Sequence, residues 1–321
     1  MSPFRAAAIL VLLTSFVAPS FAAPGGTYLP GPTLSAEAHS KELCESKPGR
    51  IFVEIANLSE CVAYTVTEGN EDRREAVFFF NGDAPPEANA AAFEAAGRAD
   101  QQLVQKIMVA WSQKLHIRYF NISRLGVQGS SGDPHNRRNI SETVIMGTAT
   151  KLLAARYGID KFAIVGQSGG STIGAGMLVM GFRNIACAVL GSGAYDVLGL
   201  LEKSANAHHA QFDRTAAART IYSPFSYINR VKPDPGRRIF ILGDTQDPKA
   251  DFSQQARFAA GLRAVGNNAT LFEISAFNHH GAANIALPAA GYCLRGAKDD
   301  SIKHIVDALS KMQRENQQAM K

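Results

Sequence analysis

A serine between glycines is the residue in this chain whose type and spacing best suit chemistry. Ser168 lies in the segment Gly166–Gly170, which fits the pattern G-x-S-x-G. A short apolar run, Phe162–Val165, precedes this segment, and small and apolar residues that suit a helix follow it. A serine hydroxyl is a poor nucleophile unless it is exposed and activated by a base. A strand, a sharp glycine turn and a helix would present the hydroxyl in that way, so Ser168 is predicted to be a nucleophile.

Such a serine needs a histidine base, and several histidines follow it in the chain. They are His208, His209, His279, His280 and His304. His279 and His280 come just after the last predicted strand, where a loop can reach the serine, and the other three are assigned to solvated surfaces. We favour His280 because Gly281 would let the loop turn sharply after it. His279 is the alternative.

The histidine in turn needs a carboxylate that fixes its tautomer and stabilises the imidazolium. Asp247 is the predicted acid, because it follows the predicted strand Arg238–Gly243 by a few residues and its loop could return to the histidine. The alternatives are Asp244, Asp251 and Asp196, and an ordinary turn aspartate is the plainer interpretation of each.

When a carbonyl carbon is attacked, negative charge develops on its oxygen, and backbone N–H groups must stabilise this oxygen by donating hydrogen bonds. One donor is predicted from Gly169, directly after the nucleophile. The second is predicted from Gly82 or Asp83, in the loop that follows the predicted strand Ala76–Phe80. These residues form the predicted oxyanion hole.

A glycine- and serine-rich loop over residues 126–138 is a candidate substrate-binding segment. It follows the predicted strand Ile117–Ile122 and would lie at the same edge of the sheet as Ser168. Its His135, Arg137 and Arg138 could hold a substrate carboxylate, with a solvated basic loop as the alternative.

Apolar and alternating runs predict eight strands and the helices between them. The strands are Arg50–Ile55, Cys61–Thr67, Ala76–Phe80, Ile117–Ile122, Phe162–Val165, Ile185–Leu190, Arg238–Gly243 and Thr270–Ala276. Helices are predicted after Ser168 and over Ala99–Leu115, Thr143–Arg156, Phe252–Val265 and Ser301–Met312, and a small cap after the sixth strand over Val197–Ala207 and Ala210–Ile221. Strands that alternate with helices indicate an α/β fold with a mostly parallel sheet covered on both faces.

The N-terminus has the pattern of a secretory signal peptide. Arg5 precedes the apolar stretch Ala6–Val17, and the small residues Ser20 and Ala22 mark a cleavage site. We therefore expect residues 1–22 to be removed, residues 23–46 to form an extended lead-in and residues 47–321 to form one domain. The protein is expected to be exported, to the periplasm or the medium, and no later stretch is long enough to span a membrane.

The chain has four cysteines, and in an oxidising compartment an even number permits two disulfides. Cys44 and Cys61 are predicted to join the lead-in to the first strands. Cys187 and Cys293 form the second predicted pair, with a buried free thiol at Cys187 as the alternative. None of the spacings resembles a zinc site, so we expect no metal.

Charge and glycine spacing exclude other classes of function. The net charge of +5 is spread thinly, without the basic block that nucleic-acid binding would favour. The G-x-G-x-x-G spacing of dinucleotide sites is absent, and we expect no cofactor.

The chain resembles the α/β-hydrolase superfamily over nearly all of its predicted mature length. After the glycine turn it is most similar to the catalytic domains of prolyl oligopeptidase-type and dienelactone hydrolase-type enzymes. The resemblance is carried by GQSGG at Gly166–Gly170, YSPFSYINRV at Tyr222–Val231 and IFILGDTQDPKADFSQQARFAAGLRAVG at Ile239–Gly266. By resemblance Asp247 is the acid and His280-Gly281 the closing His-Gly pair. Ala250-Asp251 stands where the family has Val-Pro, and Asn81-Gly82-Asp83 where it has His-Gly-Gly.

This resemblance implies a serine hydrolase that cleaves an ester, and possibly an amide, through an acyl-enzyme. A peptidase of the prolyl oligopeptidase type is one alternative. A non-catalytic binding protein on the same fold is another, but it would have no need to keep serine, acid and histidine in order. The expected substrate is a small acyl ester or a short peptide. The sequence does not indicate the oligomeric state.

Overall fold

A sheet of eight strands forms the centre of the molecule. The computed structural model describes residues 35–70, 73–83, 90–134, 137–276, 279 and 281–319, so the predicted signal peptide lies outside the described residues. The strands are β1 (Arg50–Ile55), β2 (Leu58–Val66), β3 (Glu75–Phe80), β4 (Arg118–Ile122), β5 (Lys161–Gln167), β6 (Ile185–Gly191), β7 (Arg238–Gly243) and β8 (Asn268–Glu273). The helices are α1 (Ser35–Ala38), α2 (Lys41–Glu45), α3 (Ala90–Leu115), α4 (Ile140–Arg156), α5 (Gly169–Val179), α6 (Val197–Ala207), α7 (Arg214–Ala217), the 3-10 helix η2 (Pro224–Arg230), α8 (Phe252–Ala264), α9 (Ala282–Leu294) and α10 (Asp299–Ala319).

The strand order is β1-β2-β4-β3-β5-β6-β7-β8. β2 is antiparallel to both β1 and β4, and the strands from β4 across to β8 are parallel to one another. The loops that follow the parallel strands therefore meet at one edge of the sheet, where ligands bind in open α/β sheets. The predicted mostly parallel sheet of about eight strands is confirmed.

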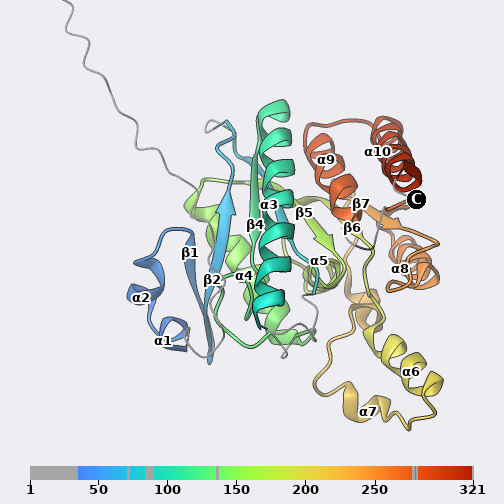
Figure 1. Cartoon of the computed structure of the whole chain (residues 1–321), viewed down its shortest axis with the longest axis horizontal. Coiled ribbons are helices and arrows are strands. Elements are labelled where there is room, and N and C mark those ends of the chain that lie inside the picture. Colours follow the sequence, from blue (N-terminus) through green and yellow to red (C-terminus); the bar gives the residue numbers. More distant parts are fainter. Residues whose placement is uncertain are drawn as a thin grey trace, which may run out of the picture.

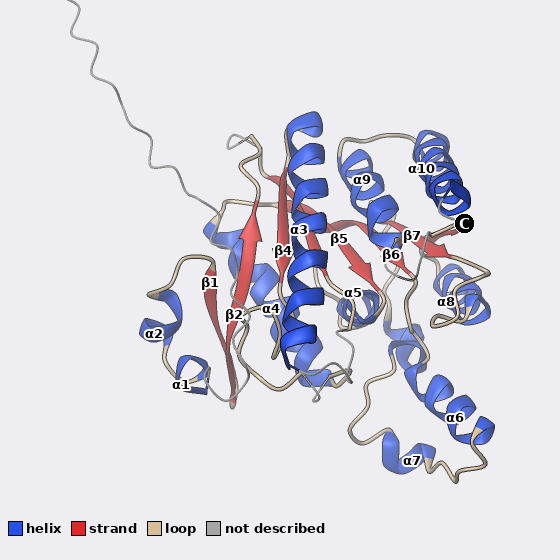
Figure 2. Ribbon diagram, in the orientation of Figure 1, coloured by secondary structure: helices blue, strands red, loops and turns tan. Residues whose placement is uncertain are grey.

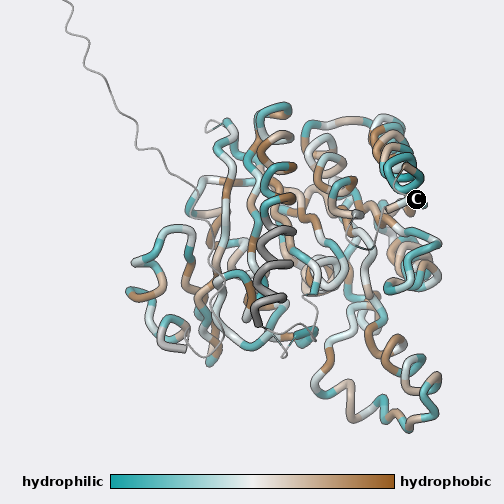
Figure 3. Tube along the Cα trace, in the orientation of Figure 1, coloured by the Kyte–Doolittle hydropathy of each residue, from teal (hydrophilic) through white to brown (hydrophobic). Residues whose placement is uncertain are grey.

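Both faces of the sheet are buried, which explains why its strands are almost continuously apolar. In β3, Phe78 and Phe80 face the cluster that α4, α5 and α8 cover, whereas Val77 and Phe79 face the cluster that α3, α9 and α10 cover. Figure 2 shows the strands running between these two groups of helices. In the tube of Figure 3, α10 is banded in hydrophobic and hydrophilic colours, and its Ile302 and Val306 are buried against the second group.

Several parts of the chain differ from the sequence-based prediction, among them the last strand, predicted at Thr270–Ala276 and observed as β8 at Asn268–Glu273. Residues 35–45 of the predicted extended lead-in form α1 and α2, where the Ser40 side chain caps α2 by accepting from the Leu43 N–H. Within the predicted cap helix Ala210–Ile221, only α7 is α-helical, although α6 matches its predicted bounds. Both cap helices project away from the sheet (Figure 1). Helix α9 was not predicted. No helix among the described residues is long and apolar enough to cross a lipid bilayer.

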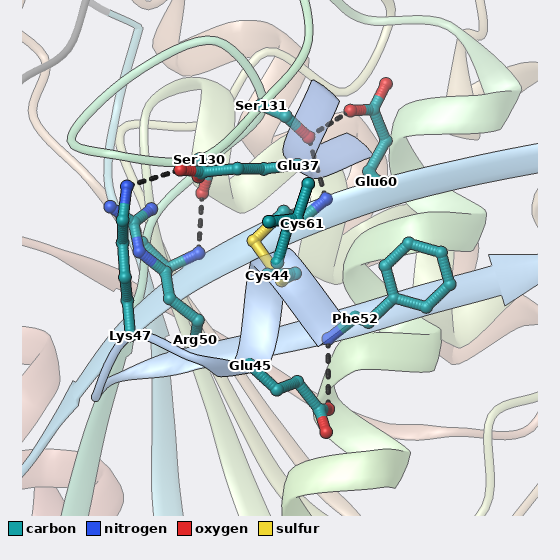
Figure 4. The surroundings of a disulfide bond; sticks show 12 residues. Glu37, Cys44, Glu45, Lys47, Arg50, Phe52, Glu60, Cys61, Ser130 and Ser131 are labelled. Carbon is teal, nitrogen blue, oxygen red and sulfur yellow. Dashed lines mark hydrogen bonds and ion pairs between the residues drawn. A yellow bond between two sulfur atoms is a disulfide. The ribbon is translucent and has the colours of Figure 1, made fainter. Parts of the chain in front are cut away.

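Both predicted disulfides are present, and all four cysteines are bonded. Cys44 in α2 is joined to Cys61 in β2, with a Cα–Cα distance of 5.5 Å. Figure 4 shows this bond next to Ser131, whose hydroxyl accepts from the Cys61 N–H at 2.7 Å. Cys187 in β6 is joined to Cys293 in α9 across 106 residues of sequence. The first disulfide ties the N-terminal helices to the sheet, and the second ties α9 to it.

Removing either disulfide should destabilise the fold, and removing the second should cost more. In the chain-entropy model, a bridge across 17 residues contributes about 3 kcal/mol and one across 106 residues between about 4 and 5 kcal/mol. Urea unfolding of Cys44→Ala/Cys61→Ala and Cys187→Ala/Cys293→Ala measures both losses. Equal stability of the first variant and the wild type would show that the N-terminal helices are held by other contacts.

Candidate active site

The turn between β5 and α5 presents Ser168 in an unusual backbone conformation. Its φ is 53° and its ψ is −118°, a combination of backbone angles that residues other than glycine rarely adopt. The Ser168 hydroxyl does not cap α5. Instead it lies 2.7 Å from Nε2 of His279. The strand, sharp turn and helix predicted around Ser168 are all present.

The glycines on either side of Ser168 are required because the backbone approaches closely there. A Cβ atom on Gly166 would lie 2.5 Å from the backbone of Ser171. A Cβ atom on Gly170 would collide with the carbonyl oxygen of Phe80, at the end of β3. The G-x-S-x-G pattern therefore reflects steric limits that only glycine meets at these two positions.

Ser168, His279 and Asp247 form one hydrogen-bonded series, although they are far apart in the sequence. Nδ1 of His279 lies 2.8 Å and 3.0 Å from the two carboxylate oxygens of Asp247, while its Nε2 faces Ser168. The side chains are largely sheltered from solvent, with 9% of His279 and 1% of Asp247 exposed. The Gln167 side chain donates to the His279 carbonyl oxygen at 2.9 Å, which anchors the histidine backbone beside the serine turn.

The histidine in this series is His279, and the sequence-based choice of His280 is corrected. His280 itself lies outside the described residues. The sequence favours His280 because Gly281 could permit a sharp turn, but Gly281 has an ordinary helical conformation, with φ −63° and ψ −18°, at the start of α9. Any residue can adopt this conformation, so Gly281 gives no reason to prefer His280.

Asp247 lies in a turn after β7 that supplies hydrogen bonds to its carboxylate. The N–H groups of Lys249 and Ala250 donate to it at 2.9 Å and 3.2 Å. Burial by itself would raise the pKa of Asp247, but the hydrogen bonds from His279 and from the Lys249 N–H outweigh burial and hold this pKa below its usual value. The carboxylate is therefore ionised at neutral pH, as the partner of an imidazolium must be.

The three alternative acids have structural partners elsewhere. Asp244 accepts from the N–H groups of Gln246 and Ala276. Asp251 caps α8 and Asp196 caps α6. Of the four aspartates weighed from the sequence, the one beside the histidine is Asp247.

The loop after β3 passes directly beside the serine turn. A Cβ atom on Gly82 would collide with the Gln167 side chain and lie 3.1 Å from Cβ of Ser168. A Cβ atom on Gly169 would collide with the carboxylate of Asp83. The three residues predicted for the oxyanion hole thus lie together around Ser168.

Asp83 is also part of a cluster of charged side chains. Its carboxylate accepts from Arg124 and from Arg138, and Arg137 lies 3.9 Å away. Arg124 in turn pairs with Glu142 at 2.7 Å. Burial would raise the pKa of Asp83, but the guanidinium groups of Arg124, Arg138 and Arg137 outweigh it and keep this pKa well below its usual value.

This cluster changes the interpretation of the loop over residues 126–138. His135 lies outside the described residues. Arg137 and Arg138, expected to be available for a substrate carboxylate, instead pair with Asp83. Arg124 and Glu142 were missed, because neither forms a local sequence pattern with Asp83. In the described part of the chain, no cluster of His, Cys, Asp or Glu side chains could hold a metal ion.

The strand order and the serine turn define the class of fold: the chain has the α/β-hydrolase fold. It resembles the esterase Pf2001 of Pyrococcus furiosus, at 13% identity and a TM-score of 0.54, over 77% of this chain and 91% of that one. It also resembles Est1E of Butyrivibrio proteoclasticus with ferulic acid bound, at 10% identity and a TM-score of 0.52, over 83% of this chain and 98% of that one.

A third similar structure is that of puromycin hydrolase, with 13% identity and a TM-score of 0.53. The match covers 78% of this chain but only 40% of that one. No protein-family model matches the chain, and no curated protein matches it. At these identities the likeness establishes the fold, and the function is argued from the site.

Proposed function

We propose that the protein is a serine hydrolase that cleaves a carboxylic ester through an acyl-enzyme. The observation that carries this proposal is the hydrogen-bonded series from Ser168 through His279 to Asp247. A nucleophile, a base and an orienting acid in contact are what acyl transfer to a serine requires. The two disulfides and the N-terminal sequence support a site of action in an oxidising compartment, outside the cytoplasm.

In the first step Ser168 Oγ attacks the ester carbonyl carbon, and Nε2 of His279 takes the hydroxyl proton. Asp247 holds the proton on Nδ1, so that Nε2 is free to accept, and it stabilises the imidazolium that forms. The carbonyl oxygen becomes an oxyanion, and the N–H groups of Gly169 and of Gly82 or Asp83 stabilise it by donating hydrogen bonds.

The tetrahedral intermediate then collapses. The bond to the alcohol oxygen breaks, His279 returns its proton to the leaving alkoxide, and the acyl group stays on Ser168. A water molecule gives a proton to His279 and attacks the acyl-enzyme. A second collapse releases the carboxylic acid and restores the serine hydroxyl. No cofactor enters these steps.

Esters are proposed ahead of amides because an alkoxide leaves readily. An amide needs well-placed protonation of the amine, and its cleavage usually draws on extended substrate contacts. The cap between β6 and β7 contains α6, α7 and η2, which are short helices. Two of the similar structures support this choice: Pf2001 is named an esterase, and Est1E has ferulic acid, a carboxylic acid, bound to it. An amide is the second candidate, since a serine, a histidine and an aspartate in this arrangement also cleave amides in other hydrolases.

The expected result is that kcat/KM for short p-nitrophenyl esters exceeds that for the matching aminoacyl p-nitroanilides by at least about 100-fold. Stopped-time absorbance assays with both series measure this ratio, and the Ser168→Ala protein provides the background rate for each substrate. Equal values for the two series would make the protein a peptidase. No turnover of either series, and no reaction with a serine-directed probe, would favour a non-catalytic binding protein.

A further inference from the structure

The charged cluster at Asp83 joins three segments of the chain next to the serine turn. Asp83 comes from the loop after β3, Arg124 from the chain just after β4, and Glu142 from the first turn of α4. The side chains are largely buried, with exposed fractions of 13% for Asp83, 4% for Arg124 and 2% for Glu142. Buried charges of this kind are costly to desolvate, and an apolar contact would hold a loop at least as firmly. A reason other than stability alone is therefore needed for them.

Arg138 is the fourth residue of the cluster, and hydrogen bonds of its backbone hold it in place. Its N–H donates to Glu142 at 2.7 Å, and its carbonyl oxygen accepts from the Tyr222 N–H at 2.8 Å. Its φ is 60°, a backbone conformation that residues other than glycine seldom adopt. The two hydrogen bonds hold the backbone in this conformation. The guanidinium group is thereby held on the second carboxylate oxygen of Asp83.

The cluster lies against the residue that follows the nucleophile. A Cβ atom on Gly169 would collide with the Asp83 carboxylate and with the Arg124 guanidinium group. The Asp83 side chain therefore lies directly against the Gly169 backbone, between the serine turn and the loop that carries Gly82. These are the segments whose N–H groups must converge on one oxygen atom, and such donors act only within a narrow range of distance.

The cluster also controls the charge beside that oxygen. An unpaired carboxylate at Asp83 would oppose the negative charge of a tetrahedral intermediate. Here the guanidinium groups of Arg124, Arg137 and Arg138 face the two carboxylates of Asp83 and Glu142. The cations thus outnumber the anions in the described cluster, which favours an oxyanion.

We propose that Arg138 and the side chain of Asp83 act as positioning groups for the oxyanion hole. Arg138, together with Arg124, holds the Asp83 side chain so that the loop after β3 keeps its N–H groups aimed at the carbonyl oxygen of the substrate. This inference rests on the proposed hydrolase function. It adds a requirement for residues that touch neither the serine nor the histidine.

The test uses Arg138→Gln, because the Arg138 side chain is 28% exposed and its loss leaves Arg124 on Asp83. Arg124 is unsuitable, since its removal would take one guanidinium partner from two buried carboxylates, Asp83 and Glu142, at once. The expected result is a fall in kcat of about 10- to 100-fold for every ester, with KM within about twofold of the wild type. Arg138→Lys should recover part of this loss.

A second measurement separates positioning from folding. A trifluoromethyl ketone adds to the active serine and places an oxyanion in the hole, so its affinity should fall by the same factor as kcat/KM. The control is Arg74→Gln, which breaks the exposed pair of Arg74 with Asp160, and it should leave kcat, KM and ketone affinity unchanged. Thermal unfolding of all variants reports on folding.

Two negative outcomes have different meanings. If the wild type hydrolyses esters and Arg138→Gln matches it in kcat and in ketone affinity, the positioning role is wrong and the proposed function stands. If the Arg138→Gln protein loses activity only in proportion to its folded fraction, the role is structural and the proposal is again wrong. If the wild type neither hydrolyses esters nor binds the ketone, the proposed function itself fails.

Discussion

Replacing Ser168 by alanine should lower kcat for a short p-nitrophenyl ester by at least about 10³-fold, because removal of one member of such a triad typically costs several orders of magnitude. Without the hydroxyl there is no acyl-enzyme, and His279 has no oxygen to deprotonate. Folding should be preserved, since the Ser168 side chain makes no capping bond to α5. Steady-state kinetics with matched thermal unfolding measures both effects.

Ser204→Ala is the control for this variant, because Ser204 lies exposed on α6 in the cap. Its kcat should equal that of the wild type. Residual activity of Ser168→Ala above about one tenth of the wild-type value would assign the nucleophile to another residue.

The second large effect distinguishes the two neighbouring histidines. His279→Ala should lose at least about 10³-fold in kcat, because the base and its contact with Asp247 disappear together. His280→Ala should stay within about threefold of the wild type, since the imidazole between Ser168 and Asp247 belongs to His279. Measuring both variants on one ester, with circular dichroism to check folding, gives a direct comparison.

Asp247→Asn completes this series. The asparagine would keep the shape but would no longer stabilise an imidazolium, so a loss of roughly 10²- to 10⁴-fold is expected. The reverse ranking of the histidine variants, with His280→Ala inactive and His279→Ala active, would restore the choice made from the sequence. An active Asp247→Asn would move the acid to Asp196 or Asp244.

The strands could be predicted from the sequence because both faces of a parallel sheet are buried. The run Ala76–Phe80 is apolar throughout, which few other structures require. Its ends agree with those of β3 to within one residue. The serine turn was predictable for a different reason. Its glycines meet close backbone contacts that leave a local mark in the sequence.

Helix α9 could not be predicted from periodicity. Eleven of its thirteen residues are buried, so it shows no polar face, and Pro288 within it argues against a helix when only the sequence is known. Its burial between the sheet, α3 and α10 depends on tertiary packing.

The sequence was enough to predict the residue types of the site and the loops that carry them, but not which of two neighbouring histidines belongs to it. The order of serine, acid and histidine located the right loops, yet the choice between His279 and His280 depends on which side chain the loop before α9 turns inward. The backbone of this loop is held by the Gln167 side chain, which comes from β5, and this contact leaves no mark in the sequence beside the histidines. The contacts of Asp83 with Arg124 and Arg138 also could not be predicted, because they span 41 and 55 residues of sequence and form no local pattern.

The central claim is that Ser168 forms a covalent intermediate with the help of His279. The most direct measurement is peptide mapping by mass spectrometry after reaction of the wild-type protein with a fluorophosphonate. We predict a single adduct, located on Ser168, and no adduct at that position in the His279→Ala protein under the same conditions. An adduct on a different serine, or ester turnover by a protein that never acquires one on Ser168, would contradict the account.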